Sequence, residues 1–278
     1  MKQVAITGGA GYIGGQTAIY FKEQGWEVTV VDRHNLPERL EPFVDRFLHD
    51  EFQNEDALKQ YASVDSIIHC AGSSLVGPSI KNPSQYYENN FIATKRMLDH
   101  LCQYGYHPKV VFSSSAAVYG NPIAIPISEE DPKLPISPYG ISKHMVEQLL
   151  ETYSEAYGLN YVGLRYFNAA GADPEGNHGY VQDPASHIIP IISRKVLNDE
   201  VFTINGNDYE TADGTCQRDY THVSDIASAH LAAMNYLLDG GKSTSFNIGR
   251  GDTNSILEII STFENVNDVK VKTEMGPR

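Results

Sequence analysis

The segment that most constrains the fold lies at the start of the chain, where a glycine-rich turn joins an apolar run to a helical pattern. Residues 4–6 are Val-Ala-Ile, typical of a short buried strand, and residues 7–14 are Thr-Gly-Gly-Ala-Gly-Tyr-Ile-Gly. Glycine permits a tight turn and lets a ligand approach the backbone, and the N-terminus of the following helix is positive and favours phosphate. A strand, such a turn and a helix in succession predict a parallel α/β sheet.

The first half of the chain repeats this alternation. Apolar runs at 28–31, 66–68, 110–112 and 161–164 alternate with helical patterns at 14–24, 86–104 and 138–157. Continuous apolar runs are typical of parallel strands buried on both faces, and the alternation implies right-handed βαβ units. We therefore predict an α/β fold with a Rossmann-type doubly wound parallel sheet over residues 1–167.

The pattern changes after Arg165. Loop-like residues 168–184 are followed by helical patterns near 187–197, 225–238 and 254–263 and by strand patterns near 201–204 and 246–248. We predict that residues 168–278 form mainly a smaller C-terminal substrate-binding lobe, interleaved with the last elements of the sheet.

Composition excludes several classes of function. The formal net charge is −14 and there is no run rich in Lys and Arg, so nucleic acid is not an expected partner. No apolar stretch reaches the ~18 residues of a membrane span. The three cysteines show no CxxC spacing and the histidines no HExxH spacing, so neither a disulfide nor a metal site is expected. We expect a soluble, cytoplasmic protein.

Two features predict a bound dinucleotide. Gly8, Gly11 and Gly14 have GxxGxxG spacing, and Asp32 stands at the end of the next apolar run. A carboxylate at that position accepts hydrogen bonds from the adenosine ribose and repels a 2′-phosphate, which favours NAD over NADP. Arg33 would weaken that preference. The alternative is a glycine-rich turn that binds no ligand.

The segment Ser-Pro-Tyr-Gly-Ile-Ser-Lys at 137–143 places Tyr139 and Lys143 one helical turn apart. A free tyrosine has a pKa near ~10, and a neighbouring cation would favour its phenolate. Three serines, ending at Ser115, follow the strand pattern at 110–112, at the edge of the sheet where ligands gather. These residues predict a catalytic site; an ordinary surface pair and a strand-capping serine loop are the alternatives.

With these motifs in this order, the chain resembles the extended short-chain dehydrogenase/reductase family, and within it the UDP-hexose 4-epimerases. Four further segments carry the resemblance along the whole chain: HCAG at 69–72, YYENN at 86–90, LRYFN at 164–168 and GNDYETADGTCQRDYTHV at 206–223. The resemblance implies NAD as cofactor, a UDP-sugar as substrate, and a homodimer formed through the helices at 86–104 and 138–157.

The resemblance also implies roles for individual residues. Tyr139 would be the base at the sugar 4-hydroxyl, and Ser115 would hydrogen-bond the reacting oxygen. Lys143 would hold the nicotinamide ribose and, together with the positive nicotinamide, lower the pKa of Tyr139. Hydride would pass from C4 to NAD and return to the other face of a 4-keto sugar. The implied cofactor contacts are Gly8, Gly11, Tyr12, Ile13, Gly14, Asp32, Asn89, Tyr139, Lys143 and Phe167. The implied substrate contacts are Ser115, Tyr139, Asn168, Ile188 and Arg218.

Some positions depart from the family pattern. Ser74 stands where many members have a lysine, and Asn205 stands where an aromatic residue often stacks on uracil. Members also usually continue beyond a segment like 274–278, and that part supplies another arginine for the diphosphate. We therefore expect the chain to be either short or cut, with weaker substrate binding. The alternatives are an epimerase of an N-acetylhexosamine, pentose or uronate, and a non-catalytic nucleotide-binding homologue.

Overall fold

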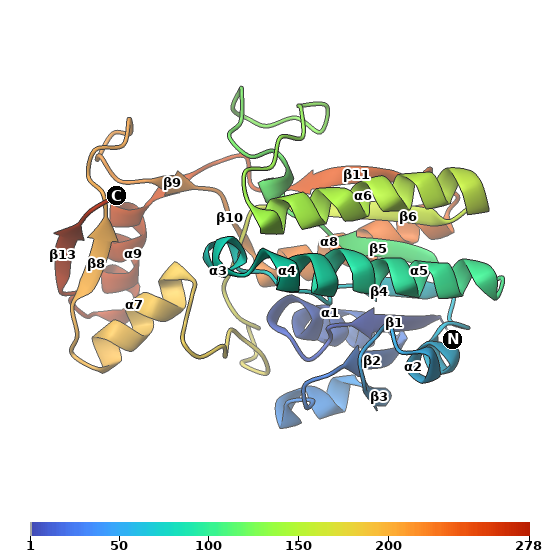
Figure 1. The fold of residues 1–278 in the computed structure, drawn as a ribbon. Coiled ribbons are helices and arrows are strands. Elements are labelled where there is room, and N and C mark those ends of the chain that lie inside the picture. Colours follow the sequence, from blue (N-terminus) through green and yellow to red (C-terminus); the bar gives the residue numbers. More distant parts are fainter. Residues whose placement is uncertain (1) are drawn as a thin grey trace.

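The computed structural model describes residues 2–278, and its central element is a parallel sheet of seven strands (Figure 1). The strand order is β11-β6-β5-β4-β1-β2-β3, which has the crossover after β3 that defines a doubly wound sheet. The bounds are β1 Gln3–Thr7, β2 Glu27–Asp32, β3 Arg46–His49, β4 Ser66–His69, β5 Lys109–Ser113, β6 Asn160–Tyr166 and β11 Thr244–Ile248. The predicted Rossmann-type α/β fold is confirmed.

Helices cover both faces of this sheet. Helices α1 (Tyr12–Glu23) and α8 (Val223–Leu238) share one apolar core with the sheet, and α2 (Glu55–Tyr61), α5 (Ala93–Gln103) and α6 (Pro138–Tyr157) share the other. Successive strand residues alternate between the two cores: Val4 and Ile6 belong to the first, and Ala5 to the second. This double burial explains why the strands are continuous apolar runs.

A smaller lobe lies beyond the carboxyl ends of the strands (Figure 1). It contains α7 (Ile188–Leu197), β8 (Phe202–Asn205), α9 (Ile256–Asn267) and β13 (Thr273–Gly276), with β8 and β13 paired in parallel. Its own core contains Ile192, Phe202, Ile204, Ile260 and Val271. Two short pairs lie between lobe and sheet: β7 (Asn168–Ala170) with β10 (Tyr220–His222), and β9 (Gln217–Arg218) with β12 (Asn254–Ser255).

The long helix predicted over 86–104 is confirmed, and it contains a π-helical segment that was not predicted. It consists of α4 (Pro83–Tyr86), the π-helical segment η2 (Tyr87–Ile92) and α5. In η2 the buried Asn90 accepts a hydrogen bond from Ser73 N at 2.7 Å and donates one to Ser142 Oγ at 2.9 Å. Asn90 therefore ties the loop after β4 to α6, and π-helical turns are frequent at functional sites.

Several short elements have no counterpart in the sequence prediction: β3, α2, α3 (Val76–Lys81), and the 3₁₀ turns η1 (Glu38–Phe43) and η3 (Ala116–Val118). They are three to seven residues long, which is too short for a hydrophobic periodicity to identify them. None of the helices within residues 2–278 is long and apolar enough to cross a membrane.

Candidate active site

The glycine turn forms one end of the site, and its glycines are sterically required. Gly8 has φ +72°, and a Cβ there would lie 2.6 Å from Ala71 N. A Cβ on Gly14 would lie 2.2 Å from the carbonyl oxygen of Gly8. Helix α1 begins after Gly11, and no side chain within residues 2–278 caps its first turn. The uncapped N-terminus therefore fits the pyrophosphate of a dinucleotide.

Asp32 ends β2 beside this turn and is buried. Its Oδ2 accepts a hydrogen bond from Ala10 N at 3.0 Å, and its Oδ1 accepts one from His34 N at 2.9 Å. These bonds hold the carboxylate at the cavity wall, and each oxygen retains a further lone pair for a ribose hydroxyl. The donor set therefore fits an adenosine ribose.

Helix α6 carries the tyrosine and the lysine. Its N-cap is Ser137, whose hydroxyl accepts from Gly140 N at 3.2 Å, and Pro138 occupies the first turn, as expected at a helix start. Tyr139 and Lys143 are only 7% and 5% exposed. Two buried polar residues that face a cavity from one helix turn are typical of a catalytic site and not of a solvated helix surface.

The pKa of Tyr139 differs from the expectation. Burial raises it above the usual value, and a hydrogen bond with Ser115 acts in the opposite direction. The Nζ of Lys143 lies 6.0 Å from the Tyr139 ring centroid and donates to the Ser113 carbonyl at 2.7 Å. In the protein groups alone the pKa of Tyr139 is therefore raised, and its lowering by Lys143 together with the positive nicotinamide stays a prediction. Burial also lowers the pKa of Lys143, to about 8.

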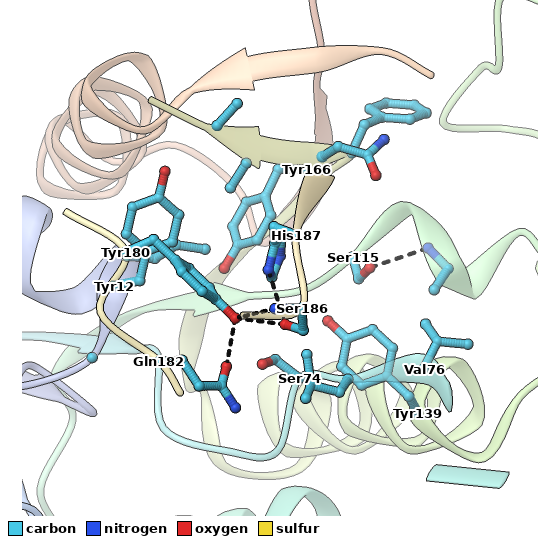
Figure 2. A pocket seen from close by; sticks show the side chains of 18 of the residues that line it. Tyr12, Ser74, Val76, Ser115, Tyr139, Tyr166, Tyr180, Gln182, Ser186 and His187 are labelled. Carbon is cyan, nitrogen blue, oxygen red and sulfur yellow. Dashed lines mark hydrogen bonds between the residues drawn. The ribbon is translucent and has the colours of Figure 1, made fainter. Parts of the chain in front are cut away.

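All the site residues predicted from the sequence line one cavity of about 2410 Å³, which runs from the glycine turn to the small lobe (Figure 2). The lining includes Gly8, Gly11, Tyr12, Ile13 and Gly14 of the glycine turn and α1, with Asp32 and Asn89, and it includes Ser115, Tyr139, Lys143 and Phe167. At the lobe end lie Asn168, Ile188 and Arg218. Arg218 is exposed, and its guanidinium contacts the Gln217 carbonyl at 2.7 Å. It therefore retains donors for an anionic ligand.

Other cavity residues were not predicted. Tyr180 packs edge-on against Tyr12, with ring centroids 5.5 Å apart, and its hydroxyl contacts Gln182 and Ser186 (Figure 2). These residues belong to an irregular loop, so no periodic pattern marks them. Tyr166, buried at the end of β6, also lines the cavity. The LRYFN motif contains it, which is the one sequence signal for its position.

A parallel doubly wound sheet with a glycine turn, a serine segment and a Tyr-Lys helix defines a nucleotide-dependent short-chain dehydrogenase/reductase-type enzyme. Comparison with known families agrees: residues 4–249 match the NAD dependent epimerase/dehydratase family, and the chain belongs to it.

Individual relatives show which enzymes of this family the chain resembles. The chain is 44% identical to a UDP-glucose 4-epimerase of Halalkalibacterium halodurans, covering 99% of this chain and 83% of the relative. It is 42% identical to the UDP-glucose 4-epimerase of Lacticaseibacillus casei, covering 99% and 84%.

Solved structures show the same resemblance. The Brucella ovis UDP-glucose 4-epimerase in complex with NAD superposes with a TM-score of 0.94 at 37% identity, covering all of this chain and 86% of that one. The Bifidobacterium longum enzyme, in complex with NAD+ and UDP, has a TM-score of 0.91 at 32% identity, with coverage of 100% and 87%.

Proposed function

We propose that the chain is a UDP-glucose 4-epimerase, which interconverts UDP-glucose and UDP-galactose with NAD as its resident cofactor. The observation that carries this proposal is the position of Ser115, Tyr139 and Lys143. They line a single cavity that is also lined by the glycine turn and by residues of the small lobe. A dinucleotide held at one end and a nucleotide-sugar held at the other bring nicotinamide and sugar together at these three residues.

NAD, when bound, supplies a carbon that accepts hydride from sugar C4 and later returns it. Tyr139, as the phenolate that Lys143 and the positive nicotinamide of bound NAD would favour, takes the proton of the 4-hydroxyl as the C4–H bond breaks, so that the alcohol is oxidised to a ketone. The proton goes back to the 4-oxygen from Tyr139 when hydride returns to the opposite face. One residue thus serves as base and then as acid, which leaves no net oxidation.

Ser115 and Lys143 assist from fixed positions. The Ser115 hydroxyl accepts from Ala117 N at 3.2 Å, so its own proton is directed away from that amide and is available for the reacting oxygen. Lys143 adds a buried cation beside the dinucleotide part of the cavity, where a positive charge favours an oxyanion. Asn168 and Arg218 contact the nucleotide-sugar in this proposal.

The test is the product formed by the purified protein from a panel of UDP-sugars, with no added cofactor. The proposal predicts that UDP-galactose gives UDP-glucose and that denaturation releases NAD. Faster conversion of a UDP-N-acetylhexosamine, UDP-pentose or UDP-uronate would contradict the assignment of substrate. NAD release without turnover of any sugar would contradict the assignment of activity.

We also propose that the protein is a homodimer formed through α5 and α6. These helices pack against each other on one side of the sheet, and no further layer of the described chain covers them (Figure 1). Met145 and Leu149 are partly exposed on α6. Light scattering that gives the mass of a monomer at micromolar concentration would contradict the proposed dimer.

We also propose that the protein is located in the cytoplasm. The free thiols of Cys70, Cys102 and Cys216 agree with that reducing compartment.

A further inference from the structure

Two of three consecutive serines are hydrogen-bonded to residues of α6. The main-chain carbonyl of Ser113 accepts a hydrogen bond from Lys143 Nζ at 2.7 Å, and the hydroxyl of Ser114 donates to Glu147 Oε1 at 2.5 Å. The hydroxyl of Ser115 faces the cavity that Tyr139 of α6 also lines. Two of these α6 residues belong to the proposed chemistry, whereas Glu147, one turn beyond Lys143, does not line the cavity.

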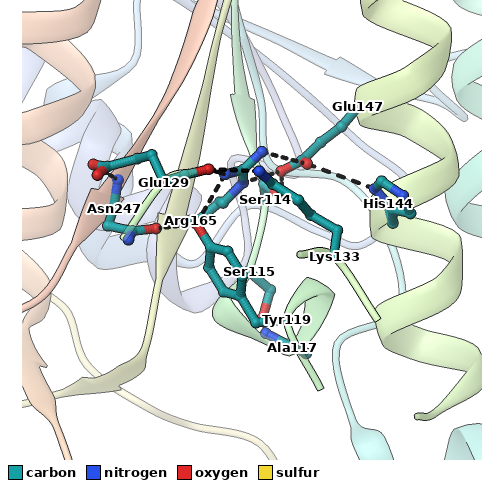
Figure 3. A network of polar contacts seen from close by, with 10 residues as sticks. All are labelled: Ser114, Ser115, Ala117, Tyr119, Glu129, Lys133, His144, Glu147, Arg165 and Asn247. Atoms are coloured by element: carbon teal, nitrogen blue, oxygen red, sulfur yellow. Dashed lines mark hydrogen bonds and ion pairs between the residues drawn. The ribbon is translucent and has the colours of Figure 1, made fainter. Parts of the chain in front are cut away.

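Glu147 is held from the other side by Arg165 of β6 (Figure 3). The pair is bidentate, with Arg165 Nε to Glu147 Oε1 and Arg165 Nη2 to Glu147 Oε2 both at 2.9 Å. Each residue is only 6% exposed. Although burial alone would raise the pKa of Glu147, the nearby His144 and the hydrogen bonds from Arg165 hold that pKa below its usual value. The Glu147 carboxylate is therefore ionised, and its negative charge is held one helical turn beyond Lys143.

Arg165 extends the network to a third element. Its Nη1 donates to Tyr119 Oη at 2.8 Å, and Tyr119 donates to Asn247 Oδ1 on β11 at 2.7 Å. Strands β5, β6 and β11 are adjacent in the sheet, so Glu147 links α6 to a rigid platform. A rotation or slide of α6 on the sheet would break several charge-assisted hydrogen bonds at once.

A contribution to folding stability alone does not explain why a buried ion pair such as Glu147–Arg165 is present. Replacing a buried ion pair by apolar residues of similar volume is often neutral or stabilising, because the charges lose their hydration. A fixed geometry is what this pair supplies and an apolar contact does not. The relevant distance is the one between the Ser115 and Tyr139 hydroxyls, which sit on the two elements that the network joins.

We propose that Glu147, clamped by Ser114 and Arg165, is a positioning residue that sets the register between the serine segment and α6 and thereby the approach of Ser115 to Tyr139. It contacts neither the substrate nor the cofactor. This inference rests on the proposed epimerase function.

The test uses matched pairs of variants on the same helix. Glu147→Gln keeps the shape and removes the charge, and its control is Glu151→Gln, an exposed residue one turn further on. Ser114→Ala removes one tether, and its control is Ser154→Ala, which removes the hydrogen bond from Ser154 Oγ to Ser243 Oγ (3.0 Å) at the far end of α6. Each variant is assayed for kcat and KM with UDP-galactose, thermal midpoint and bound NAD.

A misplaced catalytic group lowers turnover more than binding. We expect Glu147→Gln to lower kcat roughly 10- to 100-fold, with KM and bound NAD within about threefold of wild type. Ser114→Ala should lower kcat by about three- to tenfold, and both controls should leave it unchanged. Because Ser114→Ala keeps the ion pair, it remains informative if Glu147→Gln does not fold.

The inference is overturned if either variant loses thermal stability but keeps the kcat of wild type, since the network would then be structural only. It is also overturned if kcat falls equally in Ser114→Ala and Ser154→Ala. A wild-type protein that converts no UDP-sugar contradicts the proposed function instead, so the two failures are distinguishable.

Discussion

Lys143 is anchored to Ser113 and not to Tyr139: its Nζ donates to the Ser113 carbonyl at 2.7 Å. Strand β5 therefore fixes where the cation lies, and Lys143→Met should remove the charge without moving Tyr139. We expect kcat to fall by ~10²–10⁴, the range for loss of a group that supports proton transfer. Lys143→Arg should not restore the rate, because a planar guanidinium does not fit the position of a point charge. Steady-state kinetics on both variants checks this, and a near-normal rate in Lys143→Met would contradict it.

Asp32 should control which dinucleotide is held. Asp32→Ala removes the acceptor proposed for the ribose, so bound NAD should fall and the preference against a 2′-phosphate should weaken. The measurement is the amount and identity of dinucleotide released on denaturation, followed by calorimetric titration of stripped protein with NAD and NADP. Asp56→Ala, at an exposed residue that does not line the cavity, is the control. Unchanged NAD content in Asp32→Ala would disprove the assignment.

Arg218 should contribute to substrate affinity more than to turnover. A hydrogen bond to a charged group is worth ~1.5–3 kcal/mol, so Arg218→Ala should weaken UDP binding by roughly 10- to 150-fold. Arg250→Ala is the matched control, since Arg250 is exposed nearby but does not line the cavity. Calorimetric titration with UDP measures both. Equal losses in the two variants would indicate a general effect of charge and not a contact.

His69 should make stability depend on acid pH. It is buried between Thr7 (Nδ1 to Oγ1, 2.7 Å) and Thr94 (Nε2 to Oγ1, 2.8 Å), and burial, followed by the charge of Lys143, lowers its pKa to about 3. In the unfolded chain its pKa is ~6.5, so the unfolded state binds the extra proton first. The contribution of neutral His69 is full above pH ~6.5 and is lost as the pH falls toward about 3.

His69→Gln should therefore flatten the acid dependence of stability. Between pH ~6.5 and ~4 the wild-type free energy of unfolding should fall by ~2–3 kcal/mol more than that of the variant. Urea unfolding at several pH values measures this, with the exposed His34→Gln as control. Parallel curves for wild type and His69→Gln would contradict the prediction.

The sequence predicted the parts of the site that depend on local patterns. The glycine turn, the start of α6 at Pro138 and the apolar strands are all determined within a few residues, and each appears within two residues of its predicted position. The family resemblance then supplied residues such as Arg218 and Asn168, which no local pattern identifies.

The unpredicted features depend on tertiary contacts. Glu147 and Arg165 meet only because α6 packs across β6, and Tyr119 joins them only because β11 is added to the edge of the sheet. Helix periodicity gave a continuous helix over 86–104, whereas the hydrogen bonds of Asn90 favour a π-helical turn there. The effect of burial on the pKa of Tyr139 and the direction of the Lys143 side chain were not predicted, because neither can be read from a one-turn spacing.

The central claim is that Tyr139 transfers the proton of the sugar 4-hydroxyl. The most direct measurement is conversion of UDP-galactose to UDP-glucose by wild type and Tyr139→Phe, prepared with equal NAD content and no added cofactor. The account predicts that wild type reaches equilibrium and that the variant, folded and loaded, is slower by ~10²–10⁴. Conversion at the wild-type rate by Tyr139→Phe would contradict it.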